Sequence, residues 1–167
     1  MIHSSPIFVV GYMHSGTTLL LDVLSRHSAL YASSGETTFF HLFSLIRTAF
    51  PDLSTAVDRD TFASFCVGLI RGEIRLEAHG FSVRHALDAL PPQSRAIGAS
   101  IGSRSHGDTH AETLGRAFDA LAEMEDKQRW MEKTPTHVFH MEELSRAVPD
   151  ARFVELVREP RDVFASK

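Results

Sequence analysis

The chain has 167 residues, of which 43% are hydrophobic and 23% charged, and its formal net charge is −4. These values are typical of one globular domain, and the acidic balance argues against a broad nucleic-acid-binding face. The sequence has no apolar run long enough to span a membrane and no pattern of a secretory signal. Cys66 is the single cysteine, which excludes an internal disulfide. We therefore expect a cytoplasmic protein.

The first half of the chain predicts one strand followed mainly by helices. Ile7 to Val10 is a short β-branched apolar run, typical of a buried parallel strand. A helix is predicted from Thr18 to Arg26. Further helices are predicted over residues 36–50, 59–71 and 82–90, the last ended by two prolines. The range 97–108 is rich in glycine and serine and is predicted to be a loop.

The second half alternates helices with strands. The pattern predicts a helix over 109–124, a strand within RWMEKTP, a helix over 136–148 and a buried strand over 151–157. Pro160 stands where the next helix would begin. The whole pattern predicts an α/β fold with a parallel central sheet flanked by helices. Because the sequence ends at Lys167 inside this last helix, we expect residues 1–167 to be a single domain that forms the N-terminal portion of a longer fold.

The sequence GYMHSGTTLLLDVL, which begins at Gly11, is close to a Walker A phosphate loop. It follows a predicted strand and opens a predicted helix, as such a loop requires. Glycine-rich backbone and a helix N-terminus bind anions without help from side chains. Thr17 replaces the lysine that nucleoside triphosphatases use, which disfavours hydrolysis of ATP or GTP. The loop suits a phosphate or phosphosulfate, and the alternative is a tight turn with incidental glycines.

The motif HSGTTLL at 14–20, with FVELVREPRDVFAS at 153–166, resembles the sulfotransferase family that uses 3′-phosphoadenosine 5′-phosphosulfate (PAPS). The resemblance implies a P-loop-like topology, PAPS as the sulfate donor and a hydroxyl-bearing acceptor. It implies that the 3′-phosphate is bound by Arg158 and Ser166. The residues implied to bind the 5′-phosphosulfate are His14, Ser15, Gly16, Thr17 and Thr18. The family usually has Lys or Arg where this chain has His14, so this position carries weaker charge or no catalytic part.

Two more residues resemble catalytic groups of the tyrosylprotein-sulfotransferase-like branch. Glu36, in SSGETTFF, matches its general base, although Ser33 and Glu36 also have the spacing of a helix capping box. Lys133, in EKTP, matches the lysine that assists departure of the nucleotide. Alternatively, Lys133 forms an ion pair with Glu132 or with another surface carboxylate.

Two other functions fit the loop. One is a P-loop small-molecule kinase, which the missing lysine disfavours, and the other is a non-catalytic nucleotide-binding module. The ten histidines raise the possibility of a metal site. Neither the pair His106 and His110 nor the pair His137 and His140 comes with a third ligand, so no metal is predicted.

Overall fold

The computed structural model describes residues 5–76 and 82–165. In these residues one sheet has the strand order β2–β3–β1–β4. Its strands are β1 (Ile7–Gly11), β2 (Leu30–Ala32), β3 (Arg129–Lys133) and β4 (Arg152–Leu156). All three pairings are parallel, and the central strand β1 pairs with both β3 and β4. The predicted α/β class with a parallel sheet is therefore confirmed.

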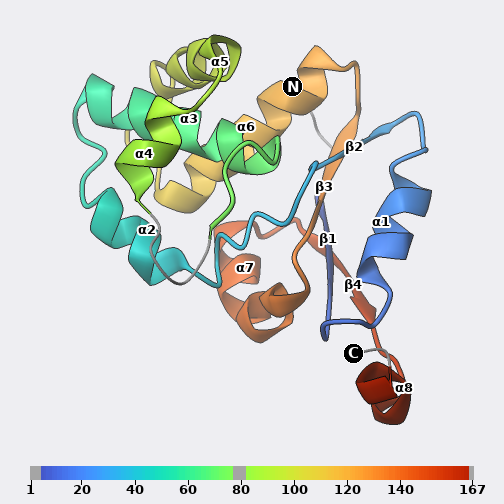
Figure 1. Cartoon of the computed structure of the whole chain (residues 1–167). Helices are drawn as coiled ribbons and strands as arrows, with labels where there is room; N and C mark the ends of the chain where they lie inside the picture. The colour runs from blue at the N-terminus through green and yellow to red at the C-terminus, as the bar shows by residue number, and fades with distance from the viewer. Residues whose placement is uncertain (1–4, 77–81, 166–167) are drawn as a thin grey trace.

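Helices cover the sheet unequally (Figure 1). Helix α1 (Thr17–Leu24) packs on β1 and β3 from one side. On the other side α3 (Ala56–Ile70) packs against α5 (Pro92–Gly102) and α6 (His110–Met124), and α6 contacts β3. The remaining helices are α2 (Phe43–Ala49), α4 (Val83–Asp88), the 3-10 helix η1 (Pro135–His140), α7 (Met141–Ala147) and α8 (Pro160–Ala165).

The helical layer holds most of the core. Phe62 and Phe65 on α3 are fully buried and their rings lie 5.0 and 5.1 Å from that of Phe50. Helix α6 begins with a capping box in which Thr109 and Glu112 bind each other's backbone N–H groups. Burial of several aromatic side chains in one cluster contributes much of the stability of a domain of this size.

The prediction of a loop over 97–108 is wrong for its first part, because residues 97–102 belong to α5. The glycines that indicated a loop serve close packing of α5 on α3. A Cβ added at Gly98 would lie 2.3 Å from Cα of Ser64, and one added at Gly102 would lie 2.6 Å from Cα of Asp60. Here glycine is needed for contact between two helices and does not signal a turn.

Other boundaries also differ from the predictions. The helix predicted over 36–50 begins only at Phe43, because the amides of residues 37, 38 and 40 are bound by side chains from another part of the chain. The helix predicted over 136–148 consists of η1 followed by α7. Strand β2 was not predicted, since its three residues are too few to show a periodic pattern.

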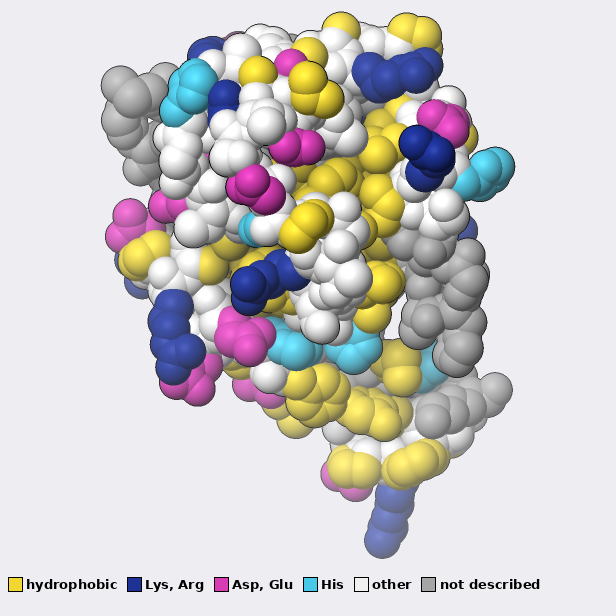
Figure 2. Space-filling view, turned by 90° about the vertical axis from the view of Figure 1, so that its left-hand side faces the viewer, with side chains coloured by type: hydrophobic (Ala, Val, Ile, Leu, Met, Phe, Trp, Pro, Cys, Tyr) yellow, Lys and Arg dark blue, Asp and Glu magenta, His cyan; other side chains and the backbone are white. Residues whose placement is uncertain are grey.

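The outer face of the helical layer carries both signs of charge. Figure 2 shows Lys and Arg side chains interspersed with Asp and Glu, around a central patch of hydrophobic side chains. A field of a single sign does not extend over this face. Any anionic ligand would therefore need donors arranged locally.

Candidate active site at the carboxyl ends of the strands

The β1–α1 loop (residues 11–18) is shaped by two glycines. At Gly11, an added Cβ would lie 2.6 Å from the carbonyl oxygen of Leu156 in the neighbouring strand. Gly16 caps α1 with a φ of 99°, a left-handed conformation that side chains disfavour. Both positions therefore require glycine for the shape of the loop.

This loop presents hydrogen-bond donors at the start of α1. The first-turn amides of a helix have no partner within the helix, and its dipole is positive at this end. The hydroxyl oxygen of Ser15 is buried without a hydrogen-bond partner in the described part of the chain. His14 has a φ of 66°, a left-handed conformation that is uncommon outside glycine. These features together fit a site for an anion.

Arg158 lies two residues after β4 and joins the β1–α1 loop. Its guanidinium donates a hydrogen bond of 3.1 Å to the carbonyl oxygen of His14, although 144 residues separate them. The side chain is exposed. Because a guanidinium has five N–H donors, this single bond leaves donors available for a phosphate.

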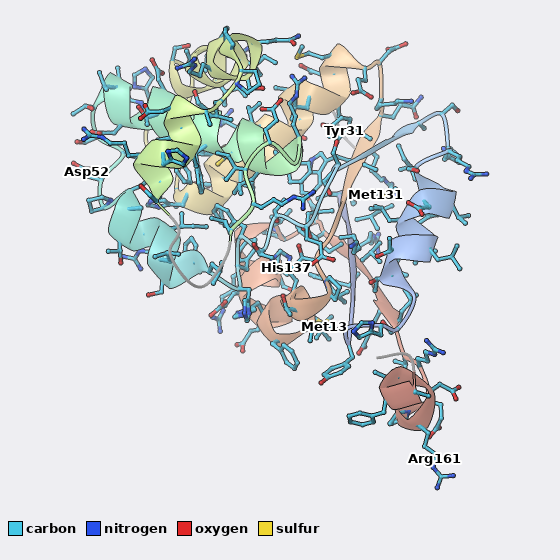
Figure 3. All side chains as sticks on the ribbon, in the orientation of Figure 1. Met13, Tyr31, Asp52, Met131, His137 and Arg161 are labelled. Carbon is cyan, nitrogen blue, oxygen red and sulfur yellow. The ribbon has the colours of Figure 1, made fainter. Side chains whose placement is uncertain are left out.

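One cleft is lined both by the β1–α1 loop and by Arg158, which follows the last strand. It has a volume of about 540 Å³ and lies where the strands end at the lower edge of the sheet in Figure 1. Its lining includes Gly16 and Arg158, and Met13, labelled in Figure 3, also lies at this edge. Parallel α/β sheets bind ligands at the carboxyl ends of their strands. The other lining residues are His14, Thr17, Thr18, Glu36, Thr38, His41, Pro135 and Thr136.

Lys133 joins the loop to Glu36. Its Nζ lies 2.5 Å from Oε1 of Glu36 and 3.3 Å from Oγ1 of Thr18. The Lys133 side chain is 6% exposed, whereas that of Glu36 is 44% exposed and faces the cleft. A buried cation with a solvent-accessible carboxylate can provide both charge stabilisation and a proton acceptor.

The structure bears on two alternatives left open by the sequence. The capping-box alternative for Ser33 and Glu36 is wrong, because α2 begins at Phe43 and the Ser33 hydroxyl donates to the carbonyl of Gly35. Lys133 does form an ion pair, and its partner is the part-exposed carboxylate of Glu36 and not Glu132. Successive residues of a strand point to opposite faces of the sheet, so Glu132 and Lys133 diverge.

Sequence reasoning missed a buried polar cluster on the other face of β3. Glu132 and His137 are fully buried, and Nδ1 of His137 lies 3.1 Å from Oε2 of Glu132. Thr134 and Thr37 also donate their hydroxyl groups to Glu132. Burial raises the pKa of Glu132, but the hydrogen bonds that its carboxylate accepts from His137, Thr134 and Thr37 outweigh this and hold the pKa below its ordinary value. The sequence signal for this cluster was Glu132 itself, a charged residue inside a predicted strand, between the apolar Met131 and the KTP motif.

Three further expectations concern Ser166, a metal site and membrane-spanning helices. Ser166, predicted to bind a 3′-phosphate, lies outside the described residues. Within residues 5–76 and 82–165, no group of three His, Cys, Asp or Glu side chains is placed to hold a metal ion. No described helix combines the length and the apolar character needed to cross a membrane.

The fold and the cleft define an α/β protein with a glycine-shaped loop between its central strand and α1. The sequence matches the model of the sulfotransferase family over residues 6–167, and the chain belongs to this family. A comparison with curated proteins finds no match.

Among solved structures, the chain is similar to the sulfotransferase STF9 from Mycobacterium avium, with 17% sequence identity and a TM-score of 0.45. The match covers 98% of this chain and 45% of that one. The chain thus spans less than half the length of the solved sulfotransferase that it matches.

Proposed function

We propose that this protein transfers a sulfuryl group from PAPS to the hydroxyl group of an acceptor. The observation that carries the proposal is the ion pair of Glu36 and Lys133, which contacts Thr18 of the β1–α1 loop. Family membership supports sulfotransfer in general. The pair supplies the proton acceptor and the cation that the reaction needs beside an anion-binding loop.

The donors around the cleft fit a nucleotide with phosphate groups at both ends. The loop offers the amides of the first turn of α1 to a 5′-phosphosulfate, with Ser15 as a further donor proposed from the resemblance alone. Arg158 offers a guanidinium to a 3′-phosphate, with Ser166 as its proposed companion from the resemblance. Thr17 and Thr18 add hydroxyl groups in the first turn of α1. A kinase would also need a loop lysine for the β- and γ-phosphates.

The chain's residues divide the chemistry between them. PAPS supplies an activated sulfuryl group whose S–O bond to the phosphate breaks as the acceptor oxygen bonds to sulfur. Glu36 accepts the proton that the acceptor hydroxyl loses. Lys133 stabilises the negative charge that develops on the nucleotide, and His14 adds a hydrogen bond there. Positioning and hydrogen-bond donors carry the catalysis in this proposal.

The test combines binding with turnover. By calorimetry, we expect micromolar affinity for 3′,5′-adenosine bisphosphate and no binding of MgATP. We also expect transfer of radiolabelled sulfate from PAPS to a hydroxyl compound in an acceptor panel. Glu36→Gln should keep the bisphosphate affinity and lose at least about 100-fold in turnover. Glu142→Gln, which changes an exposed carboxylate on α7, is the matched control and should retain full activity.

The other outcomes identify the rival functions. Binding of MgATP without the bisphosphate would favour a kinase. Binding of the bisphosphate without transfer to any acceptor would favour a non-catalytic module. Full turnover of Glu36→Gln would remove Glu36 from its proposed role while leaving sulfotransfer intact.

A further inference from the structure

The residues that follow Glu36 are held by side chains from a distant part of the sequence. Three backbone N–H groups donate to buried side chains at the end of β3 and in η1. The pairs are Thr37 with Glu132 at 3.3 Å, Thr38 with Thr134 at 3.2 Å and Phe40 with His137 at 3.2 Å. These residues precede α2, and the carbonyl groups of Thr38 and Phe40 accept the turn hydrogen bonds of Leu42 and Phe43, whereas these three amides have side chains as their partners.

His137 has a defined role in this arrangement. Its Nε2 accepts the hydrogen bond from the Phe40 amide, so the proton of the neutral ring lies on Nδ1. Nδ1 then donates to Glu132, which also accepts bonds from the hydroxyl groups of Thr37 and Thr134. Each member of the cluster satisfies another, as a buried polar network requires. In Figure 3, His137 lies beside the end of the sheet.

The end of β3 therefore contacts the Glu36 region from two directions. Lys133 binds the carboxylate of Glu36, while its neighbours Glu132 and Thr134 bind the backbone of the next two residues. Because Glu36 is 44% exposed at its side chain, packing alone does not fix its position. Its location depends on the backbone that follows it.

We propose that Glu132, Thr134 and His137 are positioning residues, which hold residues 37–40 so that Glu36 meets Lys133 and the acceptor hydroxyl. The inference rests on the proposed function and deepens it. These side chains do not line the cleft. They act through the backbone, and a shift of about 1 Å in a reacting group can cost about 100-fold in rate.

Two substitutions of His137 separate its two hydrogen bonds. His137→Gln places an amide oxygen near the position of Nε2 and can still accept from the Phe40 amide. His137→Asn is shorter, places its amide nitrogen near Nδ1 and leaves the Phe40 amide without an acceptor. We expect His137→Asn to lower kcat at least about tenfold, with KM for PAPS within about twofold of wild type. His137→Gln should recover most of the loss.

Hydrogen exchange measures the same effect without turnover. Amides 37–40 should exchange faster in His137→Asn than in His137→Gln, whereas exchange in β1 should be equal in both. If His137→Asn does not fold, the pair Thr134→Val and Thr134→Ser replaces it, because only serine keeps the hydroxyl that binds the Thr38 amide. The valine variant should then show the faster exchange and the lower kcat.

The results distinguish this inference from the proposed function. If the wild type transfers sulfate and the paired variants have equal kcat, the inference is wrong and the function stands. Equal exchange of amides 37–40 within a pair would also overturn it. If the wild type neither binds 3′,5′-adenosine bisphosphate nor transfers sulfate, the proposed function fails, and with it the catalytic role of these residues.

Discussion

The ammonium group of Lys133 lies 2.5 Å from the carboxylate of Glu36, although 97 residues separate them in the sequence. Lys133 is the last residue of β3 and contacts Thr18 at the end of the β1–α1 loop, whereas Glu36 lies in the irregular segment before α2. A resemblance between short motifs indicated each residue separately. The structure shows that they form one pair.

Lys133→Met should abolish most of the sulfotransfer while the protein stays folded. Methionine fills the buried space of the side chain but cannot stabilise charge on the departing nucleotide, so we expect turnover to fall about 100- to 1,000-fold. Lys127→Met is the matched control, because Lys127 binds the carbonyl of Ser28 away from the cleft. Steady-state sulfate transfer measures both. A Lys133→Met enzyme with wild-type kcat would contradict the role proposed for the lysine.

Arg158→Ala should reduce the preference for nucleotides that carry a 3′-phosphate. Loss of charge-assisted hydrogen bonds worth about 1.5–3 kcal/mol corresponds to about 10- to 100-fold in affinity. We expect 3′,5′-adenosine bisphosphate to lose this affinity, while 5′-AMP, which lacks the 3′-phosphate, changes little. Calorimetry with both ligands measures the difference. Arg152→Ala, at the other end of β4, should leave both affinities unchanged, and an equal loss for both ligands in Arg158→Ala would argue against the assignment.

Two glycines within helices should respond oppositely to alanine. Gly98→Ala places a Cβ 2.3 Å from Cα of Ser64, so α5 must move from α3, and we expect a loss of about 1–3 kcal/mol in the free energy of unfolding. Gly115→Ala on α6 meets no atom within 4 Å and should gain about 0.5–1 kcal/mol, because alanine favours the helix. Urea unfolding measures both, and equal effects would exclude close packing as the reason for Gly98.

Glu132 should make the fold sensitive to acid. Its pKa lies below the ordinary value of 4.5 in the folded protein, so it binds fewer protons folded than unfolded. The stabilisation it provides is complete above pH 4.5 and is lost as the pH falls through the lowered pKa of the folded state. The decrease in unfolding free energy from neutral pH to about pH 3.5 should be smaller in Glu132→Gln than in wild type. An equal decrease would show that other carboxylates account for the acid sensitivity.

The parts of the fold with strong local patterns could be predicted from sequence. The apolar run of β1, the capped helix α6 and the glycine-bearing loop all carry their signals within a few neighbouring residues. The segment 36–42 could not be predicted, since its backbone is bound by Glu132, Thr134 and His137. The glycines of α5 led to the wrong prediction of a loop, because they are needed for close contact with α3 and not for a turn. The site was indicated one residue at a time, whereas the pairing of its residues depends on tertiary structure.

The hydrogen bonds from the amides of residues 37, 38 and 40 to the end of β3 and to η1 matter for building chimeric enzymes. A hybrid that takes the chain as far as the end of α5 from this protein and the remainder from a distant homologue would separate the two halves of this junction. The backbone amides of residues 37, 38 and 40 would then lie opposite side chains of the homologue that need not accept their hydrogen bonds, even if each parental segment kept its own secondary structure. Crossover points should therefore be chosen so that residues 37–40 and the segment from the end of β3 through η1 come from the same parent, which preserves these hydrogen bonds.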